Sequence, residues 1–433
     1  MMNDENNLSS VYEEDEDTFE AGGLESASDD INYSGEDAAD LDAKMESAIA
    51  TAQGKREPCR IPRFDASDYI LNGQWDADQA EFKKEKPVCT GFSWFDSEQK
   101  LYPGLHILAA VSSLGKTSLM WQMSEQIAMS GHHVLYFSSE QTRDELYAKS
   151  FSRRIYTNKK YKNVYTAIQI RLGAADGDQA LAEQKSDFAK EVEDRLHVYE
   201  CGGYTTVEDI IDEIDYFMEE FHEKPVVVID YLQNIYATEV NGRILSDQRF
   251  NIDHIVTTLK DYQKQHKLIV IAIASVNREN YMLPVDASSL KESSKIEYSA
   301  DAIYGLNLAL IMDKDFESKS VGKSTKDTTV TDKRRMISKA YEAPVRDIVL
   351  KAVKNRFGRA SFTVYFTYEA AYDNFIQGSQ VAYASRKQAL QKEVEKELAG
   401  KVATPSQSKT DSKDSKDGSD VNSFMVDAFS KKG

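Results

Sequence analysis

Cysteine and proline are scarce in this chain of 433 residues, which has three cysteines and eight prolines. Cys59, Cys89 and Cys201 have no paired spacing, and the seven histidines show no metal-ligand spacing with them. This pattern excludes a disulfide framework and a structural zinc site, and favours reduced thiols in a cytosolic protein. The N-terminus lacks the features of a signal peptide, and no run reaches the ~18 apolar residues that a membrane span requires. We therefore expect a soluble, cytoplasmic protein.

Positive charge is nearly missing from the beginning of the chain. Residues 1–50 contain sixteen Asp or Glu and one Lys, so this segment carries −15 of the net charge of −19, and the rest of the chain carries only −4. Residues 1–38 also hold few large apolar side chains, too few to offset the entropy of ordering. We expect an acidic disordered tail, followed by a nearly neutral globular part.

The composition divides the rest of the chain into three regions. Residues 39–86 are expected to form a linker with a short helix over Asp40–Gln53, which docks either on its own core or on a neighbouring subunit. Residues 87–378 alternate apolar strands with helical segments. Residues 379–433 begin with a charged helix, Ser385–Leu398, and continue as a flexible tail. The apolar residues of Ser423–Phe429 are either a docking motif or a frayed terminus.

A phosphate-binding loop is the most informative motif. Residues 110–117 read Ala-Val-Ser-Ser-Leu-Gly-Lys-Thr and lie between an apolar run, Leu105–Val111, and a helical pattern that begins near Ser118. A strand that turns tightly into a helix N-terminus directs backbone N–H groups at one point, where a triphosphate can bind. Lys116 would reach the β- and γ-phosphates and the Thr117 hydroxyl would bind Mg²⁺. The loop residues expected to bind nucleotide are Ser113, Leu114, Gly115, Lys116, Thr117 and Ser118.

Two later apolar runs end in carboxylates. Residues 134–140 end in Glu140, and residues 226–230 end in Asp230. A nucleotide hydrolase needs one carboxylate beside the hydrated Mg²⁺ and another to deprotonate the attacking water. Asp230 suits the first role and Glu140 the second. The alternative is that both are ordinary acidic strand ends, but the order of the three motifs favours a site for ATP and Mg²⁺.

The alternation over residues 87–378 predicts an α/β fold with a mostly parallel sheet and helices on both faces. The turn at residues 355–358 predicts a C-terminal β-hairpin. Two polar insertions, Glu239–Arg249 and Lys314–Arg334, interrupt the pattern, and we expect the second to be a mobile loop. The expected strands are 105–111, 134–138, 195–199, 226–230, 268–274, 302–310, 347–353 and 361–367.

The chain resembles the C-terminal motor domain of DnaB-type replicative helicases, a RecA-like ATPase. The resemblance covers about residues 87–376, and Ala110 agrees with that family. The family's N-terminal helical domain has no counterpart in residues 1–86, which suggests a phage or mobile-element version. The motifs that carry the resemblance are Thr90–Phe92, Pro103–Leu105, Ser113–Ser118, Phe137–Glu140, Ile229–Gln233, Asn277-Arg278, Leu290–Ser293 with Ile296-Glu297 and Ala300-Asp301, and Lys354–Arg356.

The resemblance implies a homo-oligomeric ring, a hexamer in that family, which hydrolyses ATP at subunit interfaces and pulls single-stranded DNA through its channel with 5′–3′ polarity. Lys354 and Arg356 match the pair that reaches the γ-phosphate from an adjacent subunit. Without the other motifs, both would be taken as a solvated strand end. Primase, a loader or other replication proteins are expected partners through the tails.

The family's channel loop matches Leu290–Ile296, which places Lys291, Glu292 and Lys295 near DNA. Arg243 and Arg249 are further candidates for DNA contact, with ordinary surface charge as the alternative. A few cations per subunit suffice, because a ring repeats them around the channel.

One position departs from the family. Ser275 stands where the family has a Gln that senses nucleotide, which questions the coupling of hydrolysis to DNA movement.

Lys354–Gly358 also resembles a motif of RadA-type recombination ATPases. A RadA-like enzyme acting on branched DNA, and a non-motor ATP-binding replication adaptor, are the alternative functions.

Overall fold

The computed structural model describes residues 65–238, 243–276, 282–290, 294–313 and 326–402. The chain divides into two units, Met1–Ala77 and Asp78–Gly433. In the described part of the first unit, α2 (Ala66–Leu71) precedes the start of α3 (Gln74–Lys84), which continues into the second unit. Ile70, Leu71 and Trp75 are exposed there. The predicted acidic tail, the helix over 40–53 and the motif at 423–429 lie outside the described residues.

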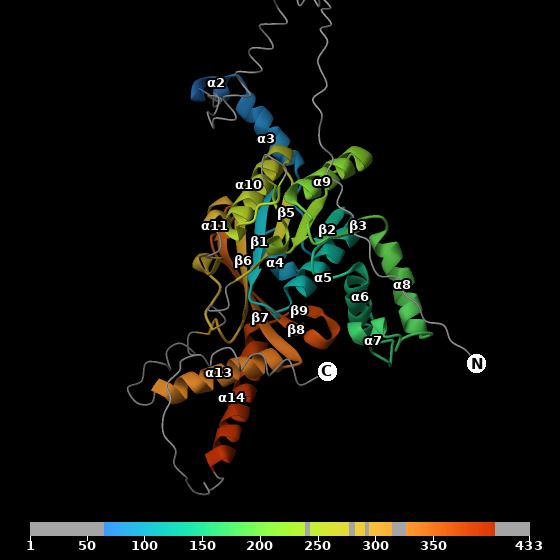
Figure 1. Ribbon diagram of the computed structural model, residues 1–433, viewed down its shortest axis with the longest axis vertical. Coiled ribbons are helices and arrows are strands. Elements are labelled where there is room, and N and C mark those ends of the chain that lie inside the picture. The colour runs from blue at the N-terminus through green and yellow to red at the C-terminus, as the bar shows by residue number, and fades with distance from the viewer. Residues whose placement is uncertain (1–64, 239–242, 277–281, 291–293, 314–325, 403–433) are drawn as a thin grey trace, which may run out of the picture. The chain divides into compact units, whose positions relative to one another are not determined.

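A mixed sheet forms the second unit. Among the described residues, nine strands make one sheet in the order β3-β2-β4-β5-β1-β6-β7-β8-β9, with β1 to β6 mutually parallel and β7 to β9 antiparallel (Figure 1). The fold class is therefore the predicted RecA-like α/β fold. The strands are β1 Gly104–Ala110, β2 Val134–Ser138, β3 Leu196–Glu200, β4 Val226–Asp230, β5 Ile269–Ser275, β6 Ala302–Leu308, β7 Val345–Asn355, β8 Thr363–Glu369 and β9 Asn374–Gln377.

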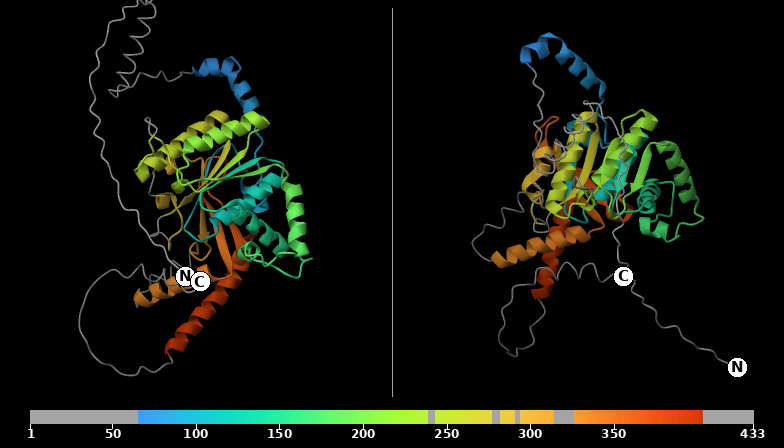
Figure 2. Two further views of the ribbon diagram at one scale, coloured as in Figure 1. Left: turned by 45° about the vertical axis from the view of Figure 1, so that its right-hand side comes forward. Right: turned by 45° about the horizontal axis from the view of Figure 1, so that its top comes forward.

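Helices cover both faces of this sheet (Figure 2). Helices α5, α6 and α8 pack together on one face, and α9, α10 and α11 on the other. Right-handed crossovers require this, because the connections from β1 to β2 and β3 run in one direction along the sheet, and those from β3 to β4, β5 and β6 run in the opposite direction. None of the described helices combines the length and apolarity needed to cross a bilayer. The remaining bounds are α4 Ser93–Glu98, α5 Lys116–Met129, α6 Arg143–Thr157, α7 Ala167–Arg171, α8 Gln179–Val192, α9 Val207–Phe221, α10 Gln248–His266, α11 Ser294–Ser299, α13 Lys326–Glu342 and α14 Gln380–Val402.

The core lies on both sides of β1, whose seven residues are all buried between β5 and β6. Helix α9 illustrates how the outer layer forms. Val207, Ile210, Ile214 and Phe217 recur at helical spacing and are buried, whereas the acidic residues between them are partly or fully exposed. Each fully buried large apolar side chain contributes about 1.5–3 kcal/mol relative to exposure. Thr206 begins the helix by accepting a hydrogen bond from the Asp209 N–H.

The C-terminal part confirms one prediction, corrects two and adds one strand that was not predicted. β7 and β8 form the predicted antiparallel hairpin. Residues 326–334, expected to belong to a loop, instead begin the helix α13, because Met336 and Ile337 are buried in the core that also contains Val394 of α14. β9 was not predicted, since its four residues are too few to show an alternation. The charged C-terminal helix begins at Gln380, five residues before its predicted start at Ser385.

Candidate functional site

The predicted phosphate loop joins β1 to α5. The helix begins at Lys116, two residues before the start expected from the sequence. Ser113 and Gly115 both have left-handed backbones, with φ of 66° and 83°. Alternating left-handed and helical residues turn successive N–H groups toward one side, which makes a cradle for an anion. The first turn of α5 adds the positive end of its dipole, so this geometry fits a nucleotide phosphate.

The other residues of the loop differ in what their side chains can do. Leu114 is fully buried, so its contribution to phosphate binding would come from its backbone. The Ser118 hydroxyl is also buried and donates to Asp373 Oδ1 at 2.6 Å. Lys149 pairs with the same carboxylate at 2.6 Å. The side chain of Ser118 therefore anchors the helix to the C-terminal region, and its backbone N–H remains for nucleotide binding.

The ammonium of Lys116, the first residue of α5, lies at the end of β1. Its Nζ donates to the carbonyl oxygens of Ala110 at 3.1 Å and Val111 at 3.3 Å. Burial lowers the pKa of Lys116, while the negative charges of Asp230 and Glu140 raise it. The ammonium thus lies in a partly desolvated position near two carboxylates, where it can bind a phosphate strongly.

Asp230 ends β4 and is 2% exposed. Its Oδ2 accepts a hydrogen bond from the Tyr136 hydroxyl at 2.8 Å. Burial raises the pKa of Asp230, and hydrogen bonds with Tyr136 and Thr117 oppose that shift. Thr117 and Asp230 are thus adjacent, as a shared contact with a hydrated Mg²⁺ requires.

Glu140 follows the end of β2, the strand beside β4. The Ser139 N–H and hydroxyl both donate to the Asp230 carbonyl, at 2.8 and 2.9 Å. These bonds join the two strand ends, so Glu140 and Asp230 lie at the same edge of the sheet as Lys116. The structure therefore brings the three predicted groups together, and their individual roles stay predictions.

The residues present fit Mg²⁺ bound together with a nucleotide. Among the residues that the structure describes, no group of three or more His, Cys, Asp or Glu forms a closed metal cage. Mg²⁺ at phosphoryl-transfer sites is typically held by one or two protein oxygens plus substrate phosphates. The Thr117 hydroxyl and the Asp230 carboxylate supply such oxygens.

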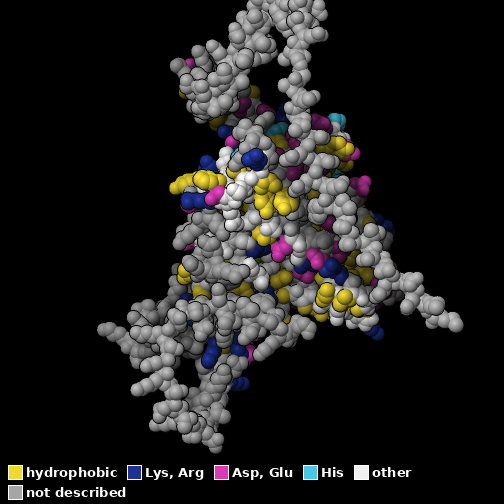
Figure 3. All heavy atoms as spheres, viewed as in Figure 1, with side chains coloured by type: hydrophobic (Ala, Val, Ile, Leu, Met, Phe, Trp, Pro, Cys, Tyr) yellow, Lys and Arg dark blue, Asp and Glu magenta, His cyan; other side chains and the backbone are white. Residues whose placement is uncertain are grey.

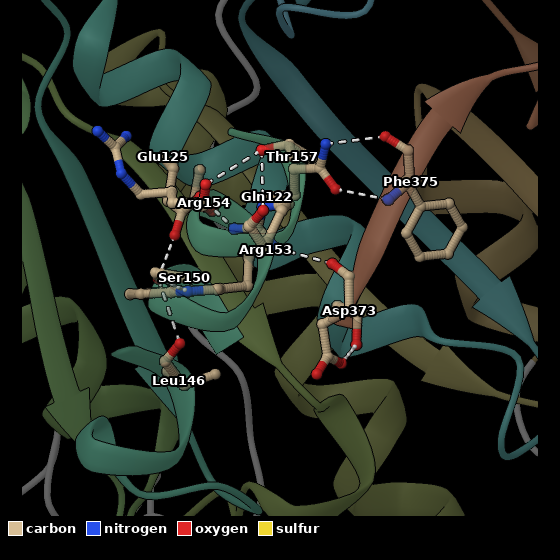
Figure 4. Close-up of polar contacts among 12 residues, drawn as sticks. Gln122, Glu125, Leu146, Ser150, Arg153, Arg154, Thr157, Asp373 and Phe375 are labelled. Carbon is tan, nitrogen blue, oxygen red and sulfur yellow. Dashed lines mark hydrogen bonds and ion pairs between the residues drawn. The ribbon is translucent and has the colours of Figure 1, made fainter. Parts of the chain in front are cut away.

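Buried polar contacts hold α5 in place (Figure 4). Gln122 of α5 exchanges two hydrogen bonds with the backbone of Phe375, at 2.8 and 2.9 Å. Arg153 of α6 pairs with Glu125 and donates to the Asp373 carbonyl at 2.8 Å. The helix that begins at the phosphate loop is thereby fixed to α6 and to the turn before β9.

Two residues of the C-terminal hairpin contact the phosphate loop and were missed by the sequence analysis. The Arg346 Nη1 donates to the Ser113 carbonyl at 2.7 Å. The Tyr368 ring lies against Gly115, where an added Cβ would come within 2.8 Å of it. Both side chains belong to strands more than 200 residues after the loop in the sequence. Their contacts with the loop therefore follow only from the three-dimensional arrangement of the sheet.

Lys354 and Arg356 lie at the opposite edge of the sheet. The register pairs Lys354 with Ile303, at the start of β6, and the start of β6 lies beside the start of β1. The phosphate loop follows the end of β1, and a strand of seven residues spans about 20 Å. Within one chain, the structure does not bring these two cations to Lys116.

Asp301 joins several elements at the edge of the sheet where Lys354 and Arg356 lie. It pairs with Lys260 at 2.6 Å and with Arg356 at 3.2 Å, and its Oδ2 accepts the Leu105 N–H at 2.9 Å. Burial would raise the pKa of Asp301, but the hydrogen bonds, that from Lys260 first, lower it below its ordinary value. The Arg356 side chain stays 53% exposed, so it can reach another molecule.

Lys354 is held by backbone oxygens. Its Nζ donates to the carbonyl of Glu297, and to that of Tyr298 at 3.3 Å. Burial, followed by the charge of Arg356, lowers the pKa of Lys354. The ammonium and the guanidinium therefore lie close together at this edge.

The candidate DNA contacts come from two different segments of the chain. Arg243 and Arg249 are exposed and follow β4, with Arg249 in the first turn of α10. Lys295 is exposed on α11, while Lys291 and Glu292 lie outside the described residues. Phe250, next to Arg249, is also exposed, and hydrophobic side chains gather on the surface between α9 and α10 (Figure 3).

Ser275 lies directly beside the phosphate loop, since it pairs with Ala110 across β5 and β1. The Gln233 side-chain amide makes two hydrogen bonds with the Ser275 backbone. Its Nε2 donates to the Ser275 carbonyl at 3.3 Å, and its Oε1 accepts the Ser275 N–H at 3.2 Å. A glutamine amide is therefore present at this position, but it comes from the segment after β4 instead of from β5.

Comparisons with known proteins agree with this geometry. Residues 88–377 match the family described as DnaB-like helicase C terminal domain. Two proteins named replicative DNA helicase DnaB, from Helicobacter pylori strains 26695 and J99, are 24% and 25% identical over 302 residues. The matched region is 66% of this chain, and it spans 59% of the length of either relative.

Two solved structures share the fold. One is an isolated ATPase domain, which is 18% identical with a TM-score of 0.54, and the match covers 73% of this chain and all of that domain. The other, a DnaB-like replicative helicase studied with its interactions with primase, is 16% identical with a TM-score of 0.53, over 79% of this chain and 76% of that one. The family match covers more than half of the sequence, and this chain therefore belongs to the DnaB-like helicase C-terminal domain family.

Proposed function

We propose that this protein is an ATP-dependent DNA helicase or translocase that acts in DNA replication as a ring-shaped homo-oligomer of six subunits. The observation that carries the proposal is the separation of Lys116 from Arg356 by the length of β1. A cation that cannot reach the phosphate loop of its own chain can complete the site of a neighbouring chain.

The half-site at the phosphate loop has the groups for ATP hydrolysis. Lys116 and the backbone N–H groups of residues 113–118 bind the phosphates, and Thr117 and Asp230 hold the hydrated Mg²⁺. When bound, that ion neutralises charge on the phosphates. Glu140 orients a water molecule and accepts its proton.

The other half-site comes from an adjacent subunit. Its Arg356, with Lys354 beside it, stabilises the negative charge that develops on the γ-phosphoryl group, an effect worth about 10³–10⁵ in rate. The exposure of Arg356 supports this role, because its ion pair with Asp301 leaves half of the side chain open to solvent. Hydrolysis then depends on assembly.

The DNA site is proposed on the loops that a ring would present to its channel. Arg243, Arg249, Lys291 and Lys295 would contact phosphates of single-stranded DNA, and Glu292, next to Lys291 in the sequence, is proposed as a further contact. The exposed ring of Phe250 offers a surface on which a base can stack. Translocation with 5′–3′ polarity is part of the proposal.

Docking surfaces for assembly and for partners are also proposed. The exposed apolar residues of α2 and α3 suit contact with another subunit. A protein of the same fold has been solved with its interactions with primase, so primase or another replication protein is a candidate partner of the tails.

Strand displacement tests the proposed function. The full chain is incubated with ATP, Mg²⁺ and a forked duplex, and the released strand is followed by fluorescence. We expect release with ATP and none with a non-hydrolysable analogue. Release of no strand despite DNA-stimulated hydrolysis would instead point to a recombination ATPase, and nucleotide binding without turnover would point to an adaptor.

A further inference from the structure

Arg346 connects the C-terminal hairpin to the phosphate loop. Its Nη1 donates to the Ser113 carbonyl at 2.7 Å, and its Nε donates to the Ala343 carbonyl at 3.3 Å. One guanidinium therefore joins the turn before β7 to the middle of the loop between β1 and α5. The planar geometry of the group fixes both directions at once.

The bonded carbonyl belongs to a peptide whose orientation matters for phosphate binding. Ser113 has a φ of 66°, a left-handed conformation that costs free energy for a residue with a side chain. In a trans peptide the Ser113 C=O and the Leu114 N–H point in opposite directions. A hydrogen bond that holds the carbonyl toward Arg346 thus directs the Leu114 N–H away from it.

Arg346 lies against a buried tyrosine of the hairpin. Arg346 and Tyr368 are cross-strand neighbours in the β7–β8 register, and the guanidinium lies 5.9 Å from the ring centre. Tyr368 is buried, stacks on Phe375 at 4.2 Å between centroids, and lies against Gly115. The loop therefore rests on two adjacent side chains of the hairpin, one beneath Gly115 and one bonded to Ser113.

We infer that Arg346 is a positioning residue of the nucleotide site: it orients the Ser113–Leu114 peptide so that the Leu114 N–H can donate to the β- and γ-phosphates of a nucleoside triphosphate. The inference rests on the proposed nucleotide site. Arg346 also polarises this peptide, since a cation on the carbonyl side strengthens the N–H as a donor.

Binding of ATP and of inorganic pyrophosphate tests this role, because pyrophosphate carries the phosphates without the base or the sugar. Affinities of the full chain are measured by calorimetry with Mg²⁺ for the natural protein, Arg346→Met and Arg346→Lys. We expect Arg346→Met to weaken both ligands about tenfold. Arg346→Lys, which keeps a charged donor but not the planar group, should weaken both ligands less than Arg346→Met does.

Arg195→Met is the matched control, because Arg195 also donates to a backbone carbonyl, that of Ala128 at 3.0 Å, but far from the loop. It should bind both ligands as the natural protein does. Thermal unfolding without ligand verifies that each variant folds, and Arg346→Gln replaces Arg346→Met if the latter does not.

Two results would overturn the inference. Unchanged affinities in Arg346→Met would show that the peptide is oriented without Arg346. A loss for ATP with no loss for pyrophosphate would show that Arg346 contacts the base or sugar directly. If the natural protein bound neither ligand, the proposed function itself would fail, so the two failures are distinguishable.

Discussion

Arg346 and Lys354 lie at opposite ends of β7, and therefore at opposite edges of the sheet. The first contacts the phosphate loop of its own chain, and the second lies beside Arg356 at the far edge. β7 thus carries Arg346, for the proposed nucleotide site of its own chain, and Lys354, which precedes Arg356 and belongs with it to the proposed site of a neighbour. The two half-sites of one chain are joined by a continuous element of the sheet.

Removal of the loop lysine should abolish hydrolysis. We expect Lys116→Ala to lower the rate by at least about 10²-fold, because it removes the buried cation that binds the β- and γ-phosphates. The measurement is phosphate release with saturating ATP and single-stranded DNA. Lys160→Ala, which removes an exposed lysine paired with Glu183, is the comparison. Turnover of Lys116→Ala near the natural rate would exclude the loop as the active site.

The far-edge arginine should matter for turnover and little for binding. We expect Arg356→Ala to lower DNA-stimulated hydrolysis about 10³-fold, with nucleotide affinity unchanged, because the residue acts on the transition state from an adjacent chain. Arg359→Ala is the matched control, since Arg359 is an exposed arginine of the same turn that pairs with Glu98. Full turnover by Arg356→Ala would refute its assignment.

The buried ion pair between α5 and α6 should be needed for stability. Glu125 and Arg153 have only 5% and 7% of their side chains exposed. Glu125→Leu leaves an uncompensated buried cation and should lower the free energy of unfolding by about 3–5 kcal/mol in urea titration. Adding Arg153→Met should recover part of the loss. A single variant as stable as the natural protein would show that the pair is not needed.

His106 should make stability depend on pH. The ring is fully buried in β1, with Nε2 donating to the Tyr102 carbonyl at 2.8 Å. Burial lowers its pKa to about 4 against an ordinary 6.5, although the bond to Tyr102 opposes this. The unfolded chain therefore binds a proton at a pH where the folded chain does not, so the folded state loses stability as pH falls from about 6.5 to 4.

The expected loss is about 3 kcal/mol over that window, at about 1.4 kcal/mol per pH unit. Urea unfolding at several pH values, compared with His106→Gln, isolates the contribution of His106 from those of the carboxylates. The variant should lose less stability on acidification. Parallel pH curves for the two proteins would show that His106 does not titrate as stated.

Much of the grouping of residues in the proposed nucleotide half-site could be predicted from the sequence. Lys116, Asp230 and Glu140 each follow an apolar run, and strands that alternate with helices pair in parallel, so their carboxyl ends meet at one edge. The strand bounds agree with the structure to within a few residues for the same reason. The buried runs leave little freedom of register.

Other parts could not be predicted because they depend on tertiary contacts. The contact of Arg346 with Ser113 depends on how β7 to β9 are placed against the loop, which local periodicity does not reveal. α13 forms on a polar segment because α14, much later in the chain, contributes to the core that buries its apolar residues. The two hydrogen bonds between the Gln233 amide and the Ser275 backbone likewise depend on tertiary structure, because they require the ends of β4 and β5 to lie side by side.

Subunit mixing tests the central claim most directly. Arg356→Ala keeps an intact phosphate loop and lacks the donated cation, whereas Glu140→Gln keeps the cation and lacks the base, so each should be inactive alone. In an equal mixture that assembles at random, about a quarter of the sites combine both intact halves. We expect DNA-stimulated ATP hydrolysis to recover to about that fraction of the natural rate, and no recovery at any ratio would contradict a site shared between subunits.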